Sequence, residues 1–555
     1  MITEEAYSEL EQAVGEDGVT REPAMLDSYS WQPFLNMSES LWVTRPVAVV
    51  LPRTTEEVQE VVRCCNRHGL KFKAISTGWG APNGPTYDDV VLVDLRRMNR
   101  IVEIDEENMY AVVEPYVCGG ELQAECWKRG LNTHLVGAGP HASPLAGATS
   151  MHGCGNDSIS MSTSSRNVLG VEWVLPSGEV LRLGSPGSGC GWFSGDGPGP
   201  SLRGIMRGTS GAFGGFGIFT RVALKLYHWP GPAAVEGEGM VLDSTHALPG
   251  CLRLFNCGFP TERDSVEAMY RIGDAEIGSV LVKMMTSELV LLMTPHLFPK
   301  LVKKGRAILK LLNEAMANPF VLLLSGNSPR ELDYQVKVLH DIIRSCGGVA
   351  MDLGAAGPAR KLMGNNLLRT TVFPTVFRFG NMFATNLDGN EATDTQNEWT
   401  HRIERDKSEY VRRGGLIDDG GENPYMICYE NNLFGHCETV YLYDHRNERH
   451  RETLKSLAFD TTLAAIEQCN VPLAAFEPVT RGLMSPLACD FNEWQKKISA
   501  AFDRNSVSDT GFYTDVKEPD YSKLDPVKVR RLRELQELYG RQSQADARGP
   551  DPGRR

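Results

Sequence analysis

The hydrophobic pattern of residues 46–75 predicts a strand, a helix and a second strand in succession. Pro46–Pro52 is a short apolar run, and Lys71–Ile75 is another. Between them, apolar side chains recur at helical spacing after Thr54, on one face formed by Val58, Val61, Val62 and Cys65. Glu56 and Glu57 place carboxylates in the first turn, where the helix dipole favours them. We expect this helix to end at about His68-Gly69.

The pattern then stays rich in β-forming residues as far as residue 226. The expected strands are Tyr87–Leu95, Ile101–Ile104, Tyr110–Pro115, the two halves of a hairpin (Val168–Pro176 and Val180–Leu183, around Gly178), and Ile218–Leu226. One short helix is expected over Gly120–Arg129. The residues before this region, 1–40, are expected to form a helical lead-in that ends at Asp27–Ser30.

Helical and strand-like patterns alternate again between residues 229 and 489, which predicts a second α+β unit. The expected helices are Thr261–Asp274, Arg330–Cys346 and Thr453–Cys469, and the expected strands are Ser279–Lys283, Pro319–Leu324, Thr371–Phe379, Tyr425–Glu430 and Thr439–Tyr443. Lys300–Leu312 reads as a basic amphipathic helix, either packed on the core or docked at a membrane surface. Val527–Tyr539 is expected to be a charged helix, and Arg541–Arg555 a disordered tail.

Three stretches of small residues interrupt the first unit: Ile75–Pro85, Gly137–Asn156 and Gly208–Gly217. Successive glycines let backbone N–H groups converge on an anion, so the first is either a phosphate cradle or a simple turn. In the dinucleotide-binding fingerprint the glycines open into a helix, whereas here a strand follows, which disfavours a Rossmann site. The second stretch is longer than a turn needs and suggests a backbone that lies against a large flat ligand.

Composition narrows the class of protein further. A chain of 555 residues with a net charge of -13 predicts two or three domains and no nucleic-acid partner. Its most apolar region, Ser279–Phe298, contains charged residues and a proline, so no transmembrane segment is expected. The 13 cysteines are scattered, without any C-x-x-C, and the N-terminus shows no signal-peptide pattern. These features predict a cytoplasmic protein with no zinc or iron–sulfur site of its own.

Residues 42–228 resemble the FAD-binding domain of the family that includes vanillyl-alcohol oxidase, p-cresol methylhydroxylase and the glycolate and D-lactate dehydrogenase flavoproteins. The resemblance rests on PVAVVLPRTTEEVQEVV, ISTGWG, DLRRMNRIVEID, YAVVEPYV, GAGPHASPLAGATSMHGCGN, RNVLGVEWVLPSGEVLRLGS and RGTSGAFGGFGIFTRVALKL, in that order. It resumes at WQKKISAAFDRNSVSDTGFY, which is similar to the family's closing K-x-x-x-DPN-x-x-x-PG-x-Y segment. There, Arg504 and Thr510 stand where prolines are usual.

The resemblance implies an α+β fold, with a two-subdomain FAD-binding domain and a cap of antiparallel sheet with flanking helices. The implied domains are a lead-in (1–41), the FAD-binding domain (42–228), the cap (229–489), a C-terminal return to the FAD-binding domain (490–520), and a charged helix with a disordered tail (521–555). The implied FAD contacts are Ser76, Thr77, Gly78, Trp79, Gly80, Asn83 and Gly84 at the pyrophosphate, Pro140, Ser143, Gly147, Ala148, Ser150 and Gly153 along the flavin, and Gly211, Gly217 and Ile218 at the adenosine half.

The resemblance also bears on how FAD is attached. Relatives that tether FAD through the pyrophosphate loop carry His near the position of Trp79, and Cys154 is displaced from the cysteine of cysteinylated relatives. Noncovalent FAD is therefore expected.

The implied catalytic residues lie in the cap. Hydroxy-acid-oxidising relatives carry a metal-binding H-x-G-D-G-N-x-H motif, of which Gly435-His436 survives here, followed by Glu438. His436 and Glu438 alternate on an expected strand and so share a side, where they form a structural pair, a catalytic base or part of a divalent metal site. Phenol-oxidising relatives instead use tyrosines and an arginine, for which Tyr425, Tyr429, Tyr441 and Arg481 are candidates. Arg481 also suits a carboxylate, or is a surface residue in a turn, and Arg378 is a weaker candidate.

The expected function is that of an FAD-dependent oxidoreductase, more a dehydrogenase than an oxidase, that takes hydride from the alcohol carbon of a 2-hydroxy acid. A phenolic or benzylic alcohol oxidase or hydroxylase is the first alternative, and a flavin-bearing electron-transfer subunit of a larger complex is the second. Electrons are expected to pass to a protein partner: an iron–sulfur protein, a cytochrome or an electron-transfer flavoprotein. An oligomer and a peripheral membrane location are both compatible with the sequence.

Overall fold

The structure is a computed structural model. It describes residues 2–30, 44–78, 84–137, 139–150, 153–189, 192, 202–206, 216–235, 237–238, 245–246, 248–283, 316–353, 367–370, 383–387, 389–418, 425–468, 470, 478–487, 490–516 and 520–547. Two expected elements, Thr371–Phe379 and Lys300–Leu312, lie outside these residues. Within them, no helix combines the length and the apolar character needed to cross a bilayer.

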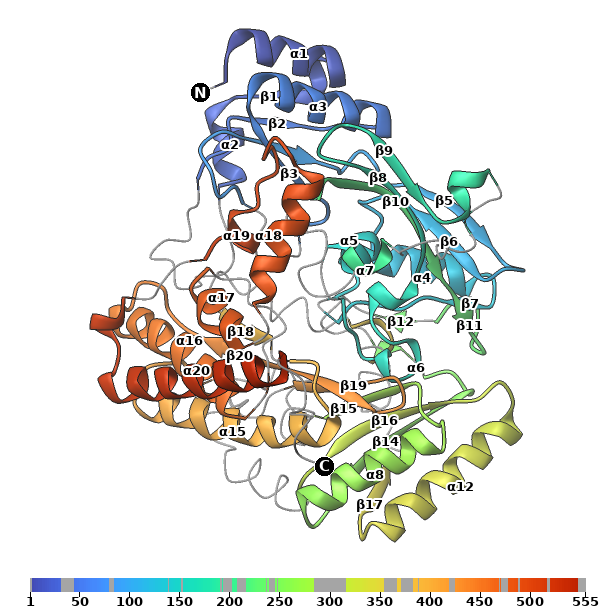
Figure 1. The fold of residues 1–555 in the computed structure, drawn as a ribbon. Helices are drawn as coiled ribbons and strands as arrows, with labels where there is room; N and C mark the ends of the chain where they lie inside the picture. Colours follow the sequence, from blue (N-terminus) through green and yellow to red (C-terminus); the bar gives the residue numbers. More distant parts are fainter. Residues whose placement is uncertain are drawn as a thin grey trace, which may run out of the picture.

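A four-stranded sheet in the order β1-β2-β4-β3 forms the first layer. Strands β2 (Ala48–Val50), β4 (Val90–Asp94) and β3 (Lys71–Ile75) are parallel, and the short β1 (Val19–Thr20) is antiparallel to β2. Helix α3 (Thr55–His68) connects β2 to β3; Thr54 caps its first turn, and Gly69 ends it with φ +63°. The predicted strand–helix–strand unit is confirmed, and α1 (Glu4–Val14) packs across α3 (Figure 1).

A five-stranded antiparallel sheet in the order β5-β6-β10-β8-β9 forms the second layer. Its strands are β5 (Ile101–Asp105), β6 (Tyr110–Val113), β10 (Ile218–Lys225), β8 (Val168–Val174) and β9 (Val180–Leu183). The predicted hairpin is confirmed, because β8 and β9 pair directly. The expected helix is α4 (Gly119–Trp127), and four further short helices are α2 (Pro23–Ser28), α5 (Pro144–Thr149), α6 (Ser158–Met161) and α7 (Arg203–Met206). The short strands β7 (Leu131–Asn132) and β11 (Tyr227–His228) pair with each other beside α4. A separate short pair is formed by β12 (Gly237–Glu238) and β13 (Thr245–His246).

A seven-stranded antiparallel sheet forms the second unit, in the order β17-β14-β16-β15-β19-β20-β18. Its strands are β14 (Leu252–Gly258), β15 (Val280–Lys283), β16 (Phe320–Ser325), β17 (Val349–Asp352), β18 (Phe383–Leu387), β19 (Tyr425–Tyr429) and β20 (Phe434–Leu442). The helices α8 (Glu262–Asp274), α12 (Pro329–Ser345), α15 (Thr393–Arg412) and α16 (Glu448–Glu467) lie along one face (Figure 1). On the other face, Val282 and Ile427 pack in one cluster with Trp127 and Trp229 of the first unit.

The sequence pattern missed α15, although it is 20 residues long. Its buried residues include Thr393, Gln396, Asn397, Thr400 and Lys407, with Trp399 and Ile403 as the large apolar ones. A helix whose buried side is largely polar gives no clear hydrophobic period. The long element was therefore invisible to a reading that depends on apolar spacing.

The C-terminal segment returns to the first unit. Helices α17 (Pro478–Met484) and α18 (Phe491–Phe502) precede a stretch that runs back beside β3, and the short helix α19 (Gly511–Thr514) follows it (Figure 1). Phe72 N donates to Val507 O over 2.7 Å, and Asp509 N donates to Phe72 O over 2.9 Å. These bonds fix residues 507–509 next to β3.

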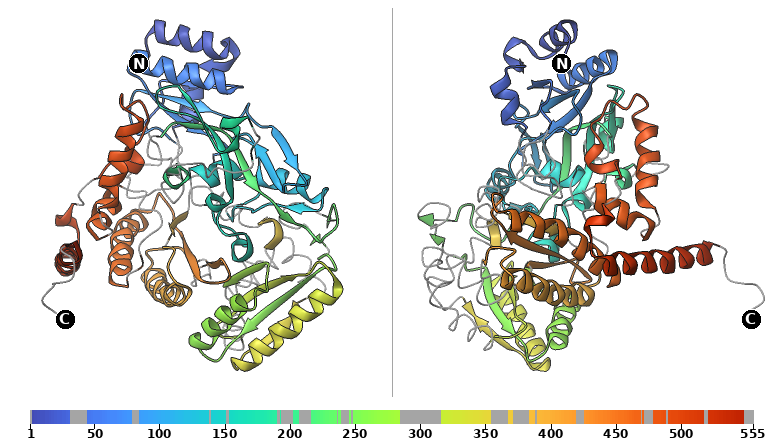
Figure 2. Two further views of the ribbon diagram at one scale, coloured as in Figure 1. Left: turned by 45° about the vertical axis from the view of Figure 1, so that its right-hand side comes forward. Right: turned by 90° about the vertical axis from the view of Figure 1, so that its left-hand side faces the viewer.

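The last helix, α20 (Pro526–Ala547), is longer than expected. Val529, Leu532 and Leu535 pack with Phe459 and Leu483, and the rest of the helix extends away from the body (Figure 2). The expectation of a disordered tail is therefore wrong for residues 541–547, and residues 548–555 lie outside the described part of the chain. Gly540 is the residue at which the helix was expected to stop, but a helix tolerates a single glycine.

Candidate functional site

The first glycine-rich loop begins where β3 ends. Ser76, Thr77 and Gly78 are half-buried, and Gly78 adopts φ +74°. Gly84, at the far end of the loop, is buried. Ligands in such folds bind beyond the carboxyl ends of parallel strands, which is where this loop lies. Trp79, Gly80 and Asn83, which complete the expected pyrophosphate contacts, lie outside the described residues.

A buried lysine on β3 holds the far end of this loop through a hydrogen bond. Lys73 on β3 is 8% exposed, and its Nζ donates to Gly84 O over 2.7 Å. The same Nζ lies 4.0 Å from Asp509 Oδ2. Burial lowers the pKa of Lys73, and the Asp509 charge opposes that shift. Because Asp509 also accepts from Thr86 N over 2.7 Å, one ion pair joins β3, the loop and the C-terminal return.

Lys73 was missed in the sequence. A lysine inside the strand KFKAI, directly before a glycine loop, is the signal that could have found it.

The second glycine-rich stretch is packed tightly against its own chain. A Cβ on Gly153 would lie 2.2 Å from Ser164 Oγ, and one on Gly147 would lie 3.0 Å from Val136 Cγ2. At Gly155 the nearest atom would be Leu135 O, at 2.0 Å. These approaches explain the small residues through internal packing, whereas the sequence suggested only a flat ligand. The two reasons are compatible, because a backbone held this closely presents a smooth surface on its other side.

The other expected flavin contacts hold the same segment in place. Ser143 Oγ donates to Pro115 O over 2.6 Å and accepts from Ala146 N, so it caps α5. Pro140 O accepts from Gly120 N over 2.8 Å. Ala148 is buried, and Ser150 ends α5 half-buried with its hydroxyl 3.2 Å from that of Thr149. These residues shape the segment, and their contact with FAD stays a prediction.

A buried histidine pairs with a carboxylate behind the segment. His134 Nδ1 lies 2.6 Å from Asp157 Oδ1, its Nε2 lies 3.2 Å from Gly153 O, and Asp157 Oδ2 accepts from Leu135 N over 3.0 Å. Burial opposes the imidazolium, but the Asp157 charge and hydrogen bonds outweigh it, so the pKa of His134 is raised. The pair fixes residues 153–157 against residues 134–135. His134 is isolated in sequence from its partner, so no local pattern marks it.

The expected adenosine contacts lie at the start of β10. Gly217 adopts φ +103°, and a Cβ there would lie 2.1 Å from Val174 O. Ile218 is buried in the core between the two sheets. Glycine is therefore required at 217 for conformation and for space. Gly211 lies outside the described residues.

Polar side chains of the cap strands β19 and β20 lie against the second glycine-rich stretch. Tyr425 lies opposite Glu438 in the β19–β20 pairing, and Ile427 lies opposite His436. Opposed residues of an antiparallel pair point to the same face, so His436 and Glu438 share one side, as expected, and Tyr425 lies on that side too. Tyr425 Oη donates to Asn156 Oδ1 of the first unit. Burial is the main cause that raises the pKa of Tyr425 far above its usual range.

Cys154, in the second glycine-rich stretch, packs against the same face of the cap sheet. Burial raises the pKa of its thiol to about 12, while a hydrogen bond with Tyr429 works in the opposite direction. The thiol is therefore protonated at neutral pH. Asn156, Cys154, Tyr425 and Tyr429 form a junction between the second glycine-rich stretch and the cap.

The structure separates two candidates from this junction. Tyr441 points to the opposite face of the sheet, where it packs with Leu416, Tyr443, Leu454 and Leu457. Arg481 lies on α17 and is 1% exposed, and its Nη1 donates to Asp515 O in the C-terminal return. The expected turn at Arg481 is a helix, and the alternative of a surface arginine is wrong. Strand parity, which puts Tyr441 five residues from His436, could have excluded Tyr441.

Arg369, which was missed in the sequence, lies on a cap segment that contacts the junction, and its own side chain lies against Trp127 and Gly120 of α4. Residues 367–370 cross from the cap: Leu367 O accepts from Asn156 Nδ2 over 3.4 Å, Thr370 Oγ1 donates to Val136 O over 3.5 Å, and Leu368 O accepts from Gln123 Nε2 over 3.0 Å. The Arg369 guanidinium lies 5.4 Å from the centre of the Trp127 ring, with Nη2 3.5 Å from Gly120 O. Among the residues described, no carboxylate pairs with Arg369, and burial lowers its pKa.

The expected divalent metal at His436 gains no support from the described residues. Among them, the single group of three His, Cys, Asp or Glu side chains close enough to share an ion is Glu9, Cys64 and His68, which does not include His436. Arg378 lies outside the described part of the chain.

Comparison with known proteins identifies the first unit. Residues 46–184 match the family model described as an FAD binding domain. The flavoprotein subunit of 4-cresol dehydrogenase (hydroxylating) from Pseudomonas putida is 31% identical over 226 residues, which cover 39% of this chain and 41% of that protein. Glycolate oxidase subunit GlcD from Bacillus subtilis is 27% identical over 232 residues, 41% of this chain and 46% of that protein.

A longer match is the probable mitochondrial D-lactate dehydrogenase of Danio rerio, 25% identical over 348 residues, 62% of this chain and 60% of that protein. Each of these matches thus spans less than two thirds of the relative's length.

Solved structures extend the likeness to the whole fold. p-Cresol methylhydroxylase with substrate bound superposes with a TM-score of 0.72 at 19% identity, covering 93% of this chain and 98% of that one. The 4-ethylphenol oxidase of Gulosibacter chungangensis superposes with a TM-score of 0.70 at 19% identity, covering 94% and 99%. The expected fold class, an FAD-binding domain of two subdomains with a cap of antiparallel sheet, is confirmed.

Proposed function

We propose that this chain, an FAD-binding flavoprotein related to p-cresol methylhydroxylase and to the glycolate and D-lactate dehydrogenases, oxidises a small 2-hydroxy acid at its alcohol carbon. FAD would supply the hydride acceptor. The protein's own task is to bind the carboxylate, orient the hydroxyl-bearing carbon and take up the hydroxyl proton.

The residues present fit an FAD molecule. Backbone N–H groups of the loop from Ser76 to Gly84 would hold the pyrophosphate, with the buried Lys73 as a positive charge beneath it. The stretch Gly147–Gly153 would lie along the flavin, kept smooth by the close packing of Gly153 on Ser164. Gly217 and Ile218 would hold the adenosine half. Cys154 is displaced from the position used by cysteinylated relatives, so we propose noncovalent FAD.

One observation carries the choice of a hydroxy acid. Arg369 is a half-buried guanidinium at the junction of the two units, and no described carboxylate neutralises it. A partly desolvated arginine without an anionic partner is unfavourable, and a ligand carboxylate would satisfy it through two parallel hydrogen bonds. We assign carboxylate binding to Arg369. Arg481, the earlier candidate, is directed to Asp515 O instead.

The proton would go to the face of the cap that carries His436 and Glu438. Glu438 is half-buried directly opposite Tyr425, and His436 lies two residues before it on the same side. We assign the base to this pair, with no metal. Tyr425, kept neutral by burial and held by Asn156, would orient the substrate oxygen.

A phenolic or benzylic alcohol is the second candidate, and a specific observation favours it. Two tyrosines, the half-buried Tyr425 and the fully buried Tyr429, face the junction from one strand. Neutral phenol groups donate to a developing phenolate and so stabilise it. In this case Arg369 would be dispensable, which makes the two candidates separable.

Two relatives suggest where the electrons go. The names of both the 4-cresol dehydrogenase flavoprotein and GlcD identify them as subunits. We propose that this chain also passes electrons to a protein partner, such as an iron–sulfur protein, a cytochrome or an electron-transfer flavoprotein.

Ligand binding to the oxidised flavoprotein tests the assignment of Arg369. Oxalate cannot donate hydride, so its binding can be followed through the flavin absorbance of the oxidised protein. The native protein should bind oxalate, and Arg369→Lys should bind it more weakly. Arg369→Met should bind it about 10- to 100-fold less tightly than the native protein. Arg344→Met is the control, because Arg344 is 78% exposed on α12. Equal oxalate affinity in Arg369→Met, with tight binding of 4-hydroxybenzyl alcohol, would favour the phenolic candidate.

A further inference from the structure

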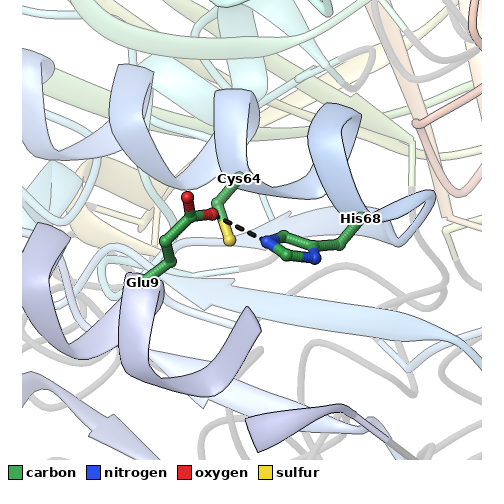
Figure 3. Close-up of side chains that lie close together, drawn as sticks. All are labelled: Glu9, Cys64 and His68. Carbon is green, nitrogen blue, oxygen red and sulfur yellow. Dashed lines mark hydrogen bonds and ion pairs between the residues drawn. The ribbon is translucent and has the colours of Figure 1, made fainter. Parts of the chain in front are cut away.

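Three side chains with metal-ligating atoms join the N-terminal helix to α3 (Figure 3). Glu9 comes from α1, and Cys64 and His68 come from α3, where a spacing of four residues puts them on one face. Their ligand atoms all lie within 4.8 Å of one another. His68 Nε2 is 2.8 Å from Glu9 Oε2, and the Cys64 sulfur lies between the two helices.

We propose that Glu9, Cys64 and His68 form a site for a zinc-type divalent cation, with water as the fourth ligand. A thiolate, an imidazole and a carboxylate are the three kinds of side chain that zinc prefers. In a tetrahedral zinc site with ordinary bond lengths, neighbouring ligand atoms are about 3.3 to 3.6 Å apart. The three atoms therefore need to move by no more than about an ångström, which rotation of the half-buried His68 and Glu9 side chains can supply.

Without a metal the Cys64 thiol is protonated, because burial and the hydrogen bond to Glu9 raise its pKa to about 12, so a cation has to displace that proton. Cys64 is 1% exposed, and its Sγ lies 3.6 Å from Ala6 O, so the thiol sits against α1. On metal binding the thiol proton would pass to solvent and the sulfur–metal bond would form. Arg67 contacts Glu9 over 3.2 Å, but its side chain is 49% exposed and can turn to water. The proton that His68 Nε2 shares with Glu9 Oε2 must also leave, or move to Nδ1, before that nitrogen can bind the metal.

Such a site would fasten α1 to the first unit. Ala6, Leu10 and Val14 are the buried residues of α1, and the last two pack in the core cluster that contains α3. A metal would add a cross-link between two helices whose described contacts are apolar packing, the Glu9 pairs with Arg67 and His68, and the contact of Cys64 Sγ with Ala6 O. The site lies at the end of the molecule farthest from the cap (Figure 1), so it is independent of the proposed oxidation reaction. Cysteine spacing did not reveal it, because one ligand comes from a separate helix.

Cobalt spectroscopy on the full-length flavoprotein tests the site. The protein is treated with a chelator, its FAD content is checked, and Co²⁺ and then Zn²⁺ are added. We expect one Co²⁺ per chain, with thiolate-to-cobalt charge-transfer absorption that Zn²⁺ abolishes, and a higher melting temperature with Zn²⁺. Cys64→Ser and His68→Asn should lose the absorption and bind Zn²⁺ at least about 10- to 100-fold more weakly, since even a lost outer-shell partner has that effect. Cys118→Ser, at a half-buried thiol elsewhere, should behave as the native protein.

The proposal is wrong if the native protein shows no charge-transfer absorption, or if the absorption persists in Cys64→Ser. Retained FAD absorbance shows that a variant has folded. Should Cys64→Ser fail to fold, His68→Asn decides, because the His68 side chain is 17% exposed and lies outside the core. Loss of metal binding in that variant supports the site, and unchanged affinity overturns it.

Discussion

Replacing Gly153 by alanine tests the packing that shapes the flavin-facing stretch. The new Cβ would lie 2.2 Å from Ser164 Oγ, 2.9 Å from Ser164 Cβ and 3.1 Å from Val136 Cγ2. Rotation of the Ser164 hydroxyl relieves the first contact only. The hydrogen bond from Ser164 N to Gly153 O, 2.7 Å long, keeps the two residues together. The segment must therefore shift, and overpacking of this kind costs about 1–3 kcal/mol.

Thermal unfolding and the FAD dissociation constant measure this effect. We expect Gly153→Ala to lower stability by about 1–3 kcal/mol and to weaken FAD binding. Gly204→Ala is the control, because nothing lies within 4 Å of a Cβ at that position. Gly153→Ala combined with Ser164→Gly removes both serine contacts and should recover most of the loss relative to Ser164→Gly alone. The packing argument fails if Gly153→Ala is as stable as the native protein, or if the double variant shows no recovery.

Three further predictions concern charged residues and a glycine. Lys73→Met should raise the FAD dissociation constant about 10-fold or more through loss of a charge-assisted contact, while Lys71→Met on the same strand should not; equal effects in a flavin fluorescence titration would contradict this. Burial lowers the pKa of Lys283 to about 8, so between pH 8 and 10 the native state has released a proton that the unfolded state keeps. The free energy of unfolding of the native protein, minus that of Lys283→Met, should therefore rise by about 1.4 kcal/mol per pH unit in this range. Chemical denaturation at several pH values measures this difference, and a difference that does not change with pH would refute the lowered pKa. Gly217→Ala, at φ +103° and 2.1 Å from Val174 O, should abolish FAD retention on gel filtration, whereas Gly250→Ala should not.

Local patterns predicted the first unit well because its elements carry strong signals. Thr54 and Gly69 mark the two ends of α3, and the Val168–Leu183 hairpin turns at Gly178, whose φ is +82°. These signals depend on neighbours in sequence, so one chain suffices to read them. The helix α15 carries no such signal, since polar residues fill its buried face.

The site was predictable only in part because it is assembled from distant segments. His436 and Glu438 were placed on one face by the period of a strand, and that expectation is confirmed. Lys73 meets Asp509, and Tyr425 meets Asn156, across hundreds of residues, and no spacing rule links such pairs. Arg369 was overlooked because it is distinguished by its surroundings: among the described residues, no carboxylate pairs with it. Only the folded structure shows which side chains are its neighbours.

Anaerobic titration of the oxidised flavoprotein is the measurement that tests the proposed function most directly. Glycolate, D-lactate, 2-hydroxyglutarate and 4-hydroxybenzyl alcohol would be added in turn while the flavin absorbance is followed. We predict rapid bleaching by at least one 2-hydroxy acid, at one equivalent per flavin, and none by the benzylic alcohol. Bleaching by the benzylic alcohol and by no hydroxy acid would contradict the account. Bleaching by none of them, but by a reduced partner protein, would identify an electron-transfer subunit instead.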